Sequence, residues 1–186
     1  MYNFITRLID SPADLFSETS WTQKNKTKPR LAGCLIGSTI ILSMGHATAQ
    51  NYTLETIAEG LDTPWSIAEL PNGGFLITER TGGLKFVDAN GLVNDIAGVP
   101  PVFAQRQGGL FDVILHPNYA DNSMIYLAYA AGDEDSNRTT IARARLGDNA
   151  LENLEVIYGV TPTKRGGGHF GGRMAFLSDG TLLLSS

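Results

Sequence analysis

The stretch WSIAELPNGGFLIT, residues 65–78, reads as an apolar strand, a Pro-Asn-Gly-Gly turn and a second apolar strand. The same order returns in GLFDVILHPNYADNSMIYLAY at residues 109–129 and in GRMAFLSDGTLLLS at residues 172–185. The turns lie 46 residues apart (Asn72 to Asn118) and then 61 residues apart (Asn118 to Asp179). Units of four strands that recur about every 40–50 residues are typical of β-propellers. The repeat therefore predicts an all-β propeller fold.

The composition agrees with many short strands joined by tight turns. Glycine accounts for 21 of the 186 residues, well above the usual share of roughly 7%. Short apolar runs separated by turn residues continue along the whole chain after Gln50. We expect strands at residues 52–58, 65–70, 75–79, 84–87, 92–96, 109–115, 124–130, 139–146, 155–160, 173–177 and 182–185. We expect a loop at residues 116–119 and a solvated hairpin tip at residues 132–137.

Residues 1–49 have the pattern of a secretory signal peptide with an extended n-region. Four basic residues between Lys24 and Arg30 precede an apolar run at residues 31–44, and Ala47-Thr48-Ala49 forms a cleavage site before Gln50. The apolar run is shorter than the roughly 20 residues that a membrane span needs. We therefore expect a periplasmic or secreted protein, without stable membrane insertion after signal cleavage.

The remaining residues, 50–186, form the predicted propeller domain. They contain about three repeat units, the third with only two strands, whereas propellers have four to eight blades. The sequence therefore predicts an incomplete propeller of about two and a half blades, truncated from a larger protein.

Charge and cysteine content exclude several classes of protein. Residues 50–186 hold nine basic and sixteen acidic residues, which argues against nucleic acid as a partner. Cys34 is the only cysteine, so the chain has no disulfide framework and no cysteine-based metal site.

The candidate site lies in KRGGGHFGGR, residues 164–173, where glycines surround His169 at the start of a predicted strand. An imidazole changes its protonation state near neutral pH. Gln107 precedes Gly108-Gly109 at the equivalent place one unit earlier, so we expect the two residues to approach each other near the mouth of the central channel. An amide for hydrogen bonding and an imidazole for proton removal suit a hydroxylated substrate.

Other motifs have simpler structural explanations. The match of residues 166–171 to the dinucleotide pattern GxGxxG lacks the required following helix. The acidic residues 133–135 lack the ligand spacing of a calcium loop, so we assign no metal ligands. His116 is expected to cap or stack on its turn.

Two further positions are interpreted through the predicted blades. Trp65 is expected in a blade core, with a place along the channel as the alternative. Gly171, Gly172 and Arg173 are expected to shape the loop and the start of the strand.

Three segments together carry a family resemblance: PWSIAELPNGGFLITERTGGLKFVD (64–88), QGGLFDVILHPNY (107–119) and HFGGRMAFLSDG (169–180). They resemble the soluble glucose/aldose sugar dehydrogenases of the glucose/sorbosone dehydrogenase type, which depend on pyrroloquinoline quinone (PQQ). The resemblance extends over residues 54–186 and is greatest to the aldose sugar dehydrogenase branch.

The resemblance implies a six-bladed propeller that binds PQQ and calcium in a cleft above its channel. It implies that His169 takes the proton from the anomeric hydroxyl of an aldose while a hydride passes to the quinone. It also implies that Gln107 lies in the same pocket, as the matching glutamine does in this family. The implied product is a lactone, and the electrons leave to an external acceptor.

The chain departs from the family pattern in two ways. Gly168 occupies the position where some members have an aspartate that orients the histidine. The arginines, the lysine and the calcium ligands that hold the quinone in the family are expected beyond residue 186, so residues 1–186 alone are expected to be inactive.

Two alternatives remain open: a calcium-dependent, six-bladed lactonase-type hydrolase, and a non-enzymatic propeller that binds carbohydrate or protein.

Overall fold

The computed structural model describes residues 4–10 and 52–186. Strands β1 (Phe4–Asp10) and β2 (Tyr52–Glu59) pair in a two-stranded sheet. The basic segment, the apolar run and the cleavage site of the predicted signal peptide lie outside the described residues.

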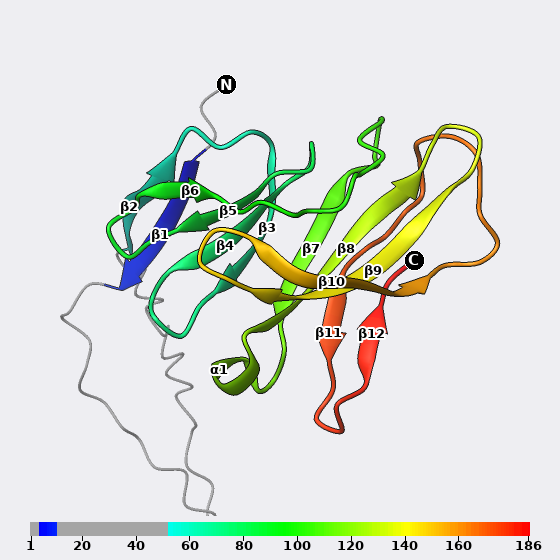
Figure 1. Cartoon of the computed structure of the whole chain (residues 1–186). Helices are drawn as coiled ribbons and strands as arrows, with labels where there is room; N and C mark the ends of the chain where they lie inside the picture. The colour runs from blue at the N-terminus through cyan, green and yellow to red at the C-terminus, as the bar shows by residue number, and fades with distance from the viewer. Residues whose placement is uncertain (1–3, 11–51) are drawn as a thin grey trace, which may run out of the picture. The chain divides into compact units, whose positions relative to one another are not determined.

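The first repeat unit folds into a four-stranded antiparallel sheet (Figure 1). The turn between its first two strands is stabilised by a hydrogen bond between a side chain and the backbone. Asn72 Oδ1 accepts the Gly74 N–H at 3.2 Å, and Gly73 between them has a φ of 83°, a conformation that favours glycine. The sheet contains, in spatial order, β3 (Pro64–Glu69), β4 (Phe75–Glu79), β5 (Leu84–Val87) and β6 (Val93–Asp95).

The second unit forms another antiparallel sheet of the same strand number, and the third contributes a hairpin. The four-stranded sheet contains β7 (Leu110–Leu115), β8 (Met124–Gly132), β9 (Asn137–Leu146) and β10 (Leu151–Gly159), each paired with the next. The hairpin pairs β11 (Met174–Phe176) with β12 (Leu182–Leu184).

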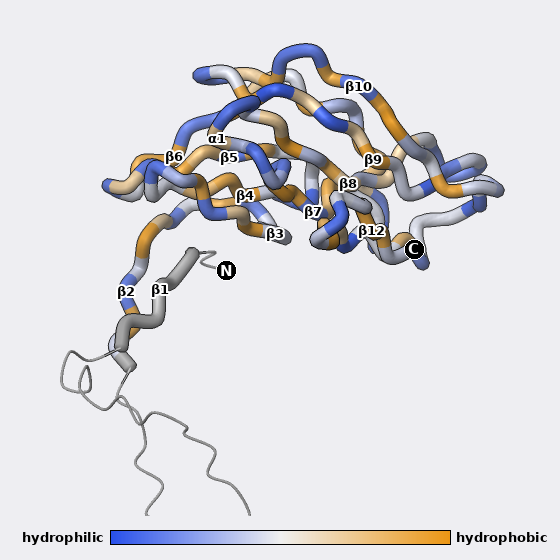
Figure 2. Tube along the Cα trace, turned by 90° about the horizontal axis from the view of Figure 1, so that it is seen from below, coloured by the Kyte–Doolittle hydropathy of each residue, from blue (hydrophilic) through white to orange (hydrophobic). Residues whose placement is uncertain are grey.

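The apolar residues of the strands form the interfaces between neighbouring units, while the intervening turns are mostly polar (Figure 2). Burial of a Leu or Phe side chain contributes roughly 1.5–3 kcal/mol, so these interfaces dominate the stability. Between the two four-stranded sheets the buried side chains include Leu76, Leu84, Leu110, Val113, Ile125 and Leu127. Between the second sheet and the hairpin they include Phe103, Phe111, Tyr126, Ile141, Phe170 and Met174. This packing places β3 beside β7 and β7 beside β11.

The predicted mostly β architecture with antiparallel sheets is confirmed, with three local differences. Strand β1 lies within residues 1–49, where the sequence predicted no strand. The expected loop at 116–119 leads into a short helix, α1 (Tyr119–Asn122), in which Asn122 N–H donates to the Asn118 carbonyl. Strand β10 begins at Leu151 rather than Glu155, because irregular pairing between Glu152 and Glu155 hides the strand from a simple alternation pattern. In the part of the chain that the structure describes, α1 is the only helix, and none is long and apolar enough to cross a bilayer.

Candidate functional site

The loops that precede β7 and β11 meet through two hydrogen bonds. The Gln107 N–H donates to the Gly167 carbonyl at 2.8 Å, and the His169 N–H donates to Gln107 Oε1 at 2.8 Å. His169 has a left-handed backbone with a φ of 59°, and both residues are exposed. The structure thus brings the two site residues predicted from sequence into direct contact.

Gly109 shows why glycines must follow Gln107. Its φ is +152°, and a Cβ at this position would lie 2.2 Å from the Arg80 carbonyl oxygen. The same carbonyl accepts the Leu110 N–H at 3.0 Å, and the Arg80 side chain donates to the Gly108 carbonyl at 3.2 Å. The end of β4 in the first sheet therefore fixes the loop that carries Gln107.

We expect Gly109→Ala to lower the free energy of unfolding by about 2–4 kcal/mol, because a strained backbone and a steric clash add together. Gly73→Ala is the matched control, since Gly73 also has a positive φ but no atom within 4 Å of the added Cβ. The control should lose only about 1 kcal/mol. Urea unfolding of both variants measures the difference, and equal losses would show that the approach of Arg80 is unimportant.

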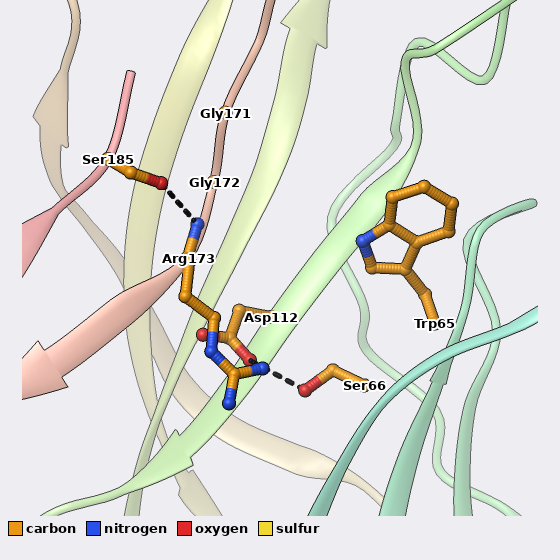
Figure 3. Close-up of a pocket in the computed structure, with 7 residues that line it drawn as sticks. All are labelled: Trp65, Ser66, Asp112, Gly171, Gly172, Arg173 and Ser185. Carbon is orange, nitrogen blue, oxygen red and sulfur yellow. Dashed lines mark hydrogen bonds and ion pairs between the residues drawn. The ribbon is translucent and has the colours of Figure 1, made fainter.

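A pocket of about 230 Å³ lies between the first strands of the three units, and its lining includes Gly171 and Gly172, which follow His169 in the chain (Figure 3). The prediction of Trp65 in a blade core is wrong: the side chain is 55% exposed and its indole borders this pocket. Neighbouring residues of a strand point to opposite faces, and Ser66 takes the buried position on β3. The pocket is lined by Trp65, Ser66, Asp112, Gly171, Gly172, Arg173 and Ser185.

Asp112 is the polar centre of this pocket and is only 2% exposed. Its carboxylate accepts the Ser66 hydroxyl at 2.6 Å and the Met174 N–H at 2.7 Å. The exposed Arg173 guanidinium lies 3.4 Å away. A buried carboxylate is tolerated only with such partners. Asp112, on β7, therefore joins the first strands of all three units.

Sequence reasoning missed Asp112. Its signal is a carboxylate inside the otherwise apolar strand LFDVIL, residues 110–115. Gly171, Gly172 and Arg173 do shape the loop and the strand start as predicted: the Arg173 N–H donates to Ser185 Oγ at 3.0 Å, and a Cβ on Gly172 would lie 2.6 Å from the Phe111 ring.

The arginines nearest the candidate site are paired with other groups of the described residues. Arg80 is hydrogen-bonded to backbone carbonyls, Arg165 pairs with Asp135, and Arg173 pairs with Asp112. These three arginines are therefore already paired and are not available to bind the carboxylates of a quinone. Over residues 4–10 and 52–186, no three His, Cys, Asp or Glu side chains gather to hold a metal ion.

The simpler interpretations of the other motifs agree with the structure. His116 Nδ1 accepts the Asn118 N–H at 3.0 Å, and its ring stacks on Tyr126 with centroids 6.2 Å apart. Residues 133–136 form the tip between β8 and β9, where Asp133 Oδ1 accepts two backbone N–H groups. A strand, β11, follows the GxGxxG match.

The fold and the site define a protein of repeated β-sheet units in which Gln107 contacts the backbone of His169 and Asp112 joins the first strands of three units. A sequence model of the glucose/sorbosone dehydrogenase family matches residues 61–186. The chain therefore belongs to the glucose/sorbosone dehydrogenase family.

Individual relatives agree with this assignment. An uncharacterised protein of Synechocystis is 45% identical over 139 residues, covering 69% of this chain and 34% of the relative. An aldose sugar dehydrogenase of Escherichia coli is 37% identical over 144 residues, covering 75% of this chain and 39% of that protein. The PQQ-bound structure of an aldose sugar dehydrogenase from Streptomyces coelicolor superimposes with a TM-score of 0.60 at 32% identity, covering 69% of this chain and 39% of that one. The chain thus spans less than two fifths of the length of these relatives.

Proposed function

We propose that this chain forms part of a quinoprotein dehydrogenase that oxidises the anomeric hydroxyl of an aldose to a lactone. The single observation that carries the proposal is the hydrogen bond from the His169 N–H to Gln107 Oε1, which joins two exposed residues in a chain of this family. PQQ, when bound, supplies the acceptor for the hydride that leaves the anomeric carbon. The electrons then pass to an external acceptor.

His169 is the catalytic base in this proposal. Its imidazole takes the proton of the anomeric hydroxyl, which raises the electron density on that oxygen as the carbon is oxidised. Gln107 Oε1 is already occupied by the His169 N–H. The amide N–H₂ of Gln107 remains as a donor for a substrate hydroxyl.

Gly168 bears on how His169 is oriented. A Cβ at position 168 would lie 3.6 Å from Gln107 Oε1, so a side chain there would face the glutamine. We infer that this protein orients its histidine through the backbone contact with Gln107 rather than through an aspartate at position 168.

We also propose that the complete domain is a six-bladed propeller. An apolar cavity of about 420 Å³ lies between the edge of the second sheet and the hairpin, and exposed Ile157, Tyr158 and Leu183 contribute to it. Apolar surface of this kind marks a packing interface. We propose that further strands of the third blade cover it, and that calcium and quinone ligands come from later blades.

Residues 1–49 complete the proposal as a signal peptide that directs the protein to the periplasm or the exterior. Cleavage before Gln50 is the expected processing step.

The proposal is tested by reconstituting the full-length protein with PQQ and calcium and measuring aldose-dependent dye reduction. We expect reduction to require both the sugar and PQQ, and we expect none from residues 1–186 alone. Lactone hydrolysis without dye reduction would instead indicate a lactonase. Sugar or protein binding without either reaction would indicate a binding propeller.

A further inference from the structure

We propose that Asn137 and Thr139 of β9 are positioning residues for His169. This inference rests on the function proposed above. The two side chains hold the carbonyl groups of Gly166 and Phe170, which lie on either side of the histidine in the chain.

The loop needs such support because His169 has a left-handed backbone without being a glycine. A non-glycine residue keeps this conformation only where its surroundings over-determine it. The His169 side chain is exposed. The restraint must therefore act through the backbone of the residues around it.

Asn137 restrains the first half of the loop. It is fully buried, and its amide N–H₂ donates to the Gly166 carbonyl at 3.0 Å and to the Asp133 carbonyl at 2.6 Å. Its Oδ1 accepts from Lys164 Nζ at 2.7 Å. The backbones of Asn137 and Lys164 exchange two hydrogen bonds, of 2.8 and 2.9 Å. The Asn137 side chain thus holds Lys164 and Gly166 at the start of the loop and ties them to the tip between β8 and β9.

Thr139 restrains the second half. It is 3% exposed, and its hydroxyl donates to the Phe170 carbonyl. The Phe170 ring packs against Phe111 with centroids 5.6 Å apart, and Lys164 Nζ lies 3.4 Å from the centre of the same ring. Burial lowers the pKa of Lys164, and the nearby charge of Glu134 opposes that shift.

Residues 137 and 139 are two apart on one strand and therefore project from the same face of β9. One face of a rigid strand holds both ends of the histidine loop, while Gln107 holds its middle through Gly167 and His169. A misplacement of about 1 Å lowers a reaction rate by up to about 10²-fold, so this support affects turnover.

The test compares Thr139→Val and Asn137→Ala with two controls. Thr139→Ser keeps the hydroxyl and should behave like the parent protein. Asn122→Ala removes a comparable amide at the opposite end of β7, where it contacts His116 and the Met124 N–H. Thr139→Val preserves side-chain volume, so it remains informative if Asn137→Ala does not fold.

Two measurements are made on each full-length variant. Hydrogen exchange of the Gln107 and His169 amides should become at least about tenfold faster in the two test variants, since these amides report local opening of the loop. In the holoenzyme, kcat should fall by about 10–100-fold while KM for the aldose changes little, because the geometry of the base is altered rather than the affinity for the sugar. Thr139→Ser and Asn122→Ala should change neither quantity.

The two readouts separate the possible failures. Unchanged amide exchange in Thr139→Val and Asn137→Ala would overturn the proposal. Suppose that His169→Gln lowers kcat, but Thr139→Val and Asn137→Ala show faster exchange with an unchanged kcat. This result would also overturn the proposal. If His169→Gln itself leaves kcat unchanged, the proposed role of His169 as base fails, and a positioning role in catalysis is refuted with it. Amide exchange then still reports whether β9 holds the loop.

Discussion

Replacing His169 with Gln in the full-length enzyme is expected to lower kcat for aldose oxidation by about 10²–10⁴-fold, the usual contribution of a positioned general base. The amide of Gln occupies a similar volume but does not accept a proton at neutral pH. KM for the sugar should change less than kcat. Steady-state dye reduction with saturating PQQ and calcium measures both quantities.

His116→Gln is the matched control for this experiment. His116 lies in the turn between β7 and β8 and stacks on Tyr126, outside the candidate site. We expect kcat to change by no more than about threefold, as for substitutions away from a functional feature. A loss below about tenfold in His169→Gln, or comparable losses in the two variants, would remove His169 from the role of base.

Asp112→Ala is expected to lower the free energy of unfolding by about 2–4 kcal/mol. Removal of the carboxylate leaves the Ser66 hydroxyl and the Met174 N–H without their acceptor in a buried position. Each unsatisfied buried donor costs about 1–3 kcal/mol. Urea unfolding monitored by tryptophan fluorescence measures the loss.

Arg173→Ala is the matched control, because it removes the other partner of the ion pair with Asp112. The Arg173 side chain is 77% exposed, and exposed ion pairs contribute about 0–1 kcal/mol. We therefore expect a loss of less than about 1 kcal/mol from Arg173→Ala. If Asp112→Ala lowers the free energy of unfolding as little as Arg173→Ala does, the carboxylate does not join the first strands.

Local sequence patterns predicted most of the fold. Apolar runs bounded by Asn-Gly and Gly-Gly turns located β4 and β5 at their exact bounds, and most other strands within two residues. Strand β10 was located less well because its alternation is broken by irregular pairing with β9. Turn chemistry is local, so it is readable from a single sequence, whereas pairing irregularities depend on the partner strand.

The candidate site was predictable only in part. The equivalent placement of Gln107 and His169 in successive repeats anticipated their contact. Trp65 was misplaced because hydrophobicity favours burial, while strand alternation gave the buried position to Ser66. Asn137 and Thr139 carried no motif, since their importance comes from carbonyl groups about thirty residues later in the chain.

The most direct test of the account is the pH dependence of kcat/KM for aldose oxidation by the full-length enzyme and its His169→Gln variant. A general base acts in its unprotonated form, so the activity of the parent enzyme should rise with pH as the base loses its proton. We predict that this rise is absent in the variant. An identical rise in both proteins would show that another group removes the proton, and would contradict the central claim.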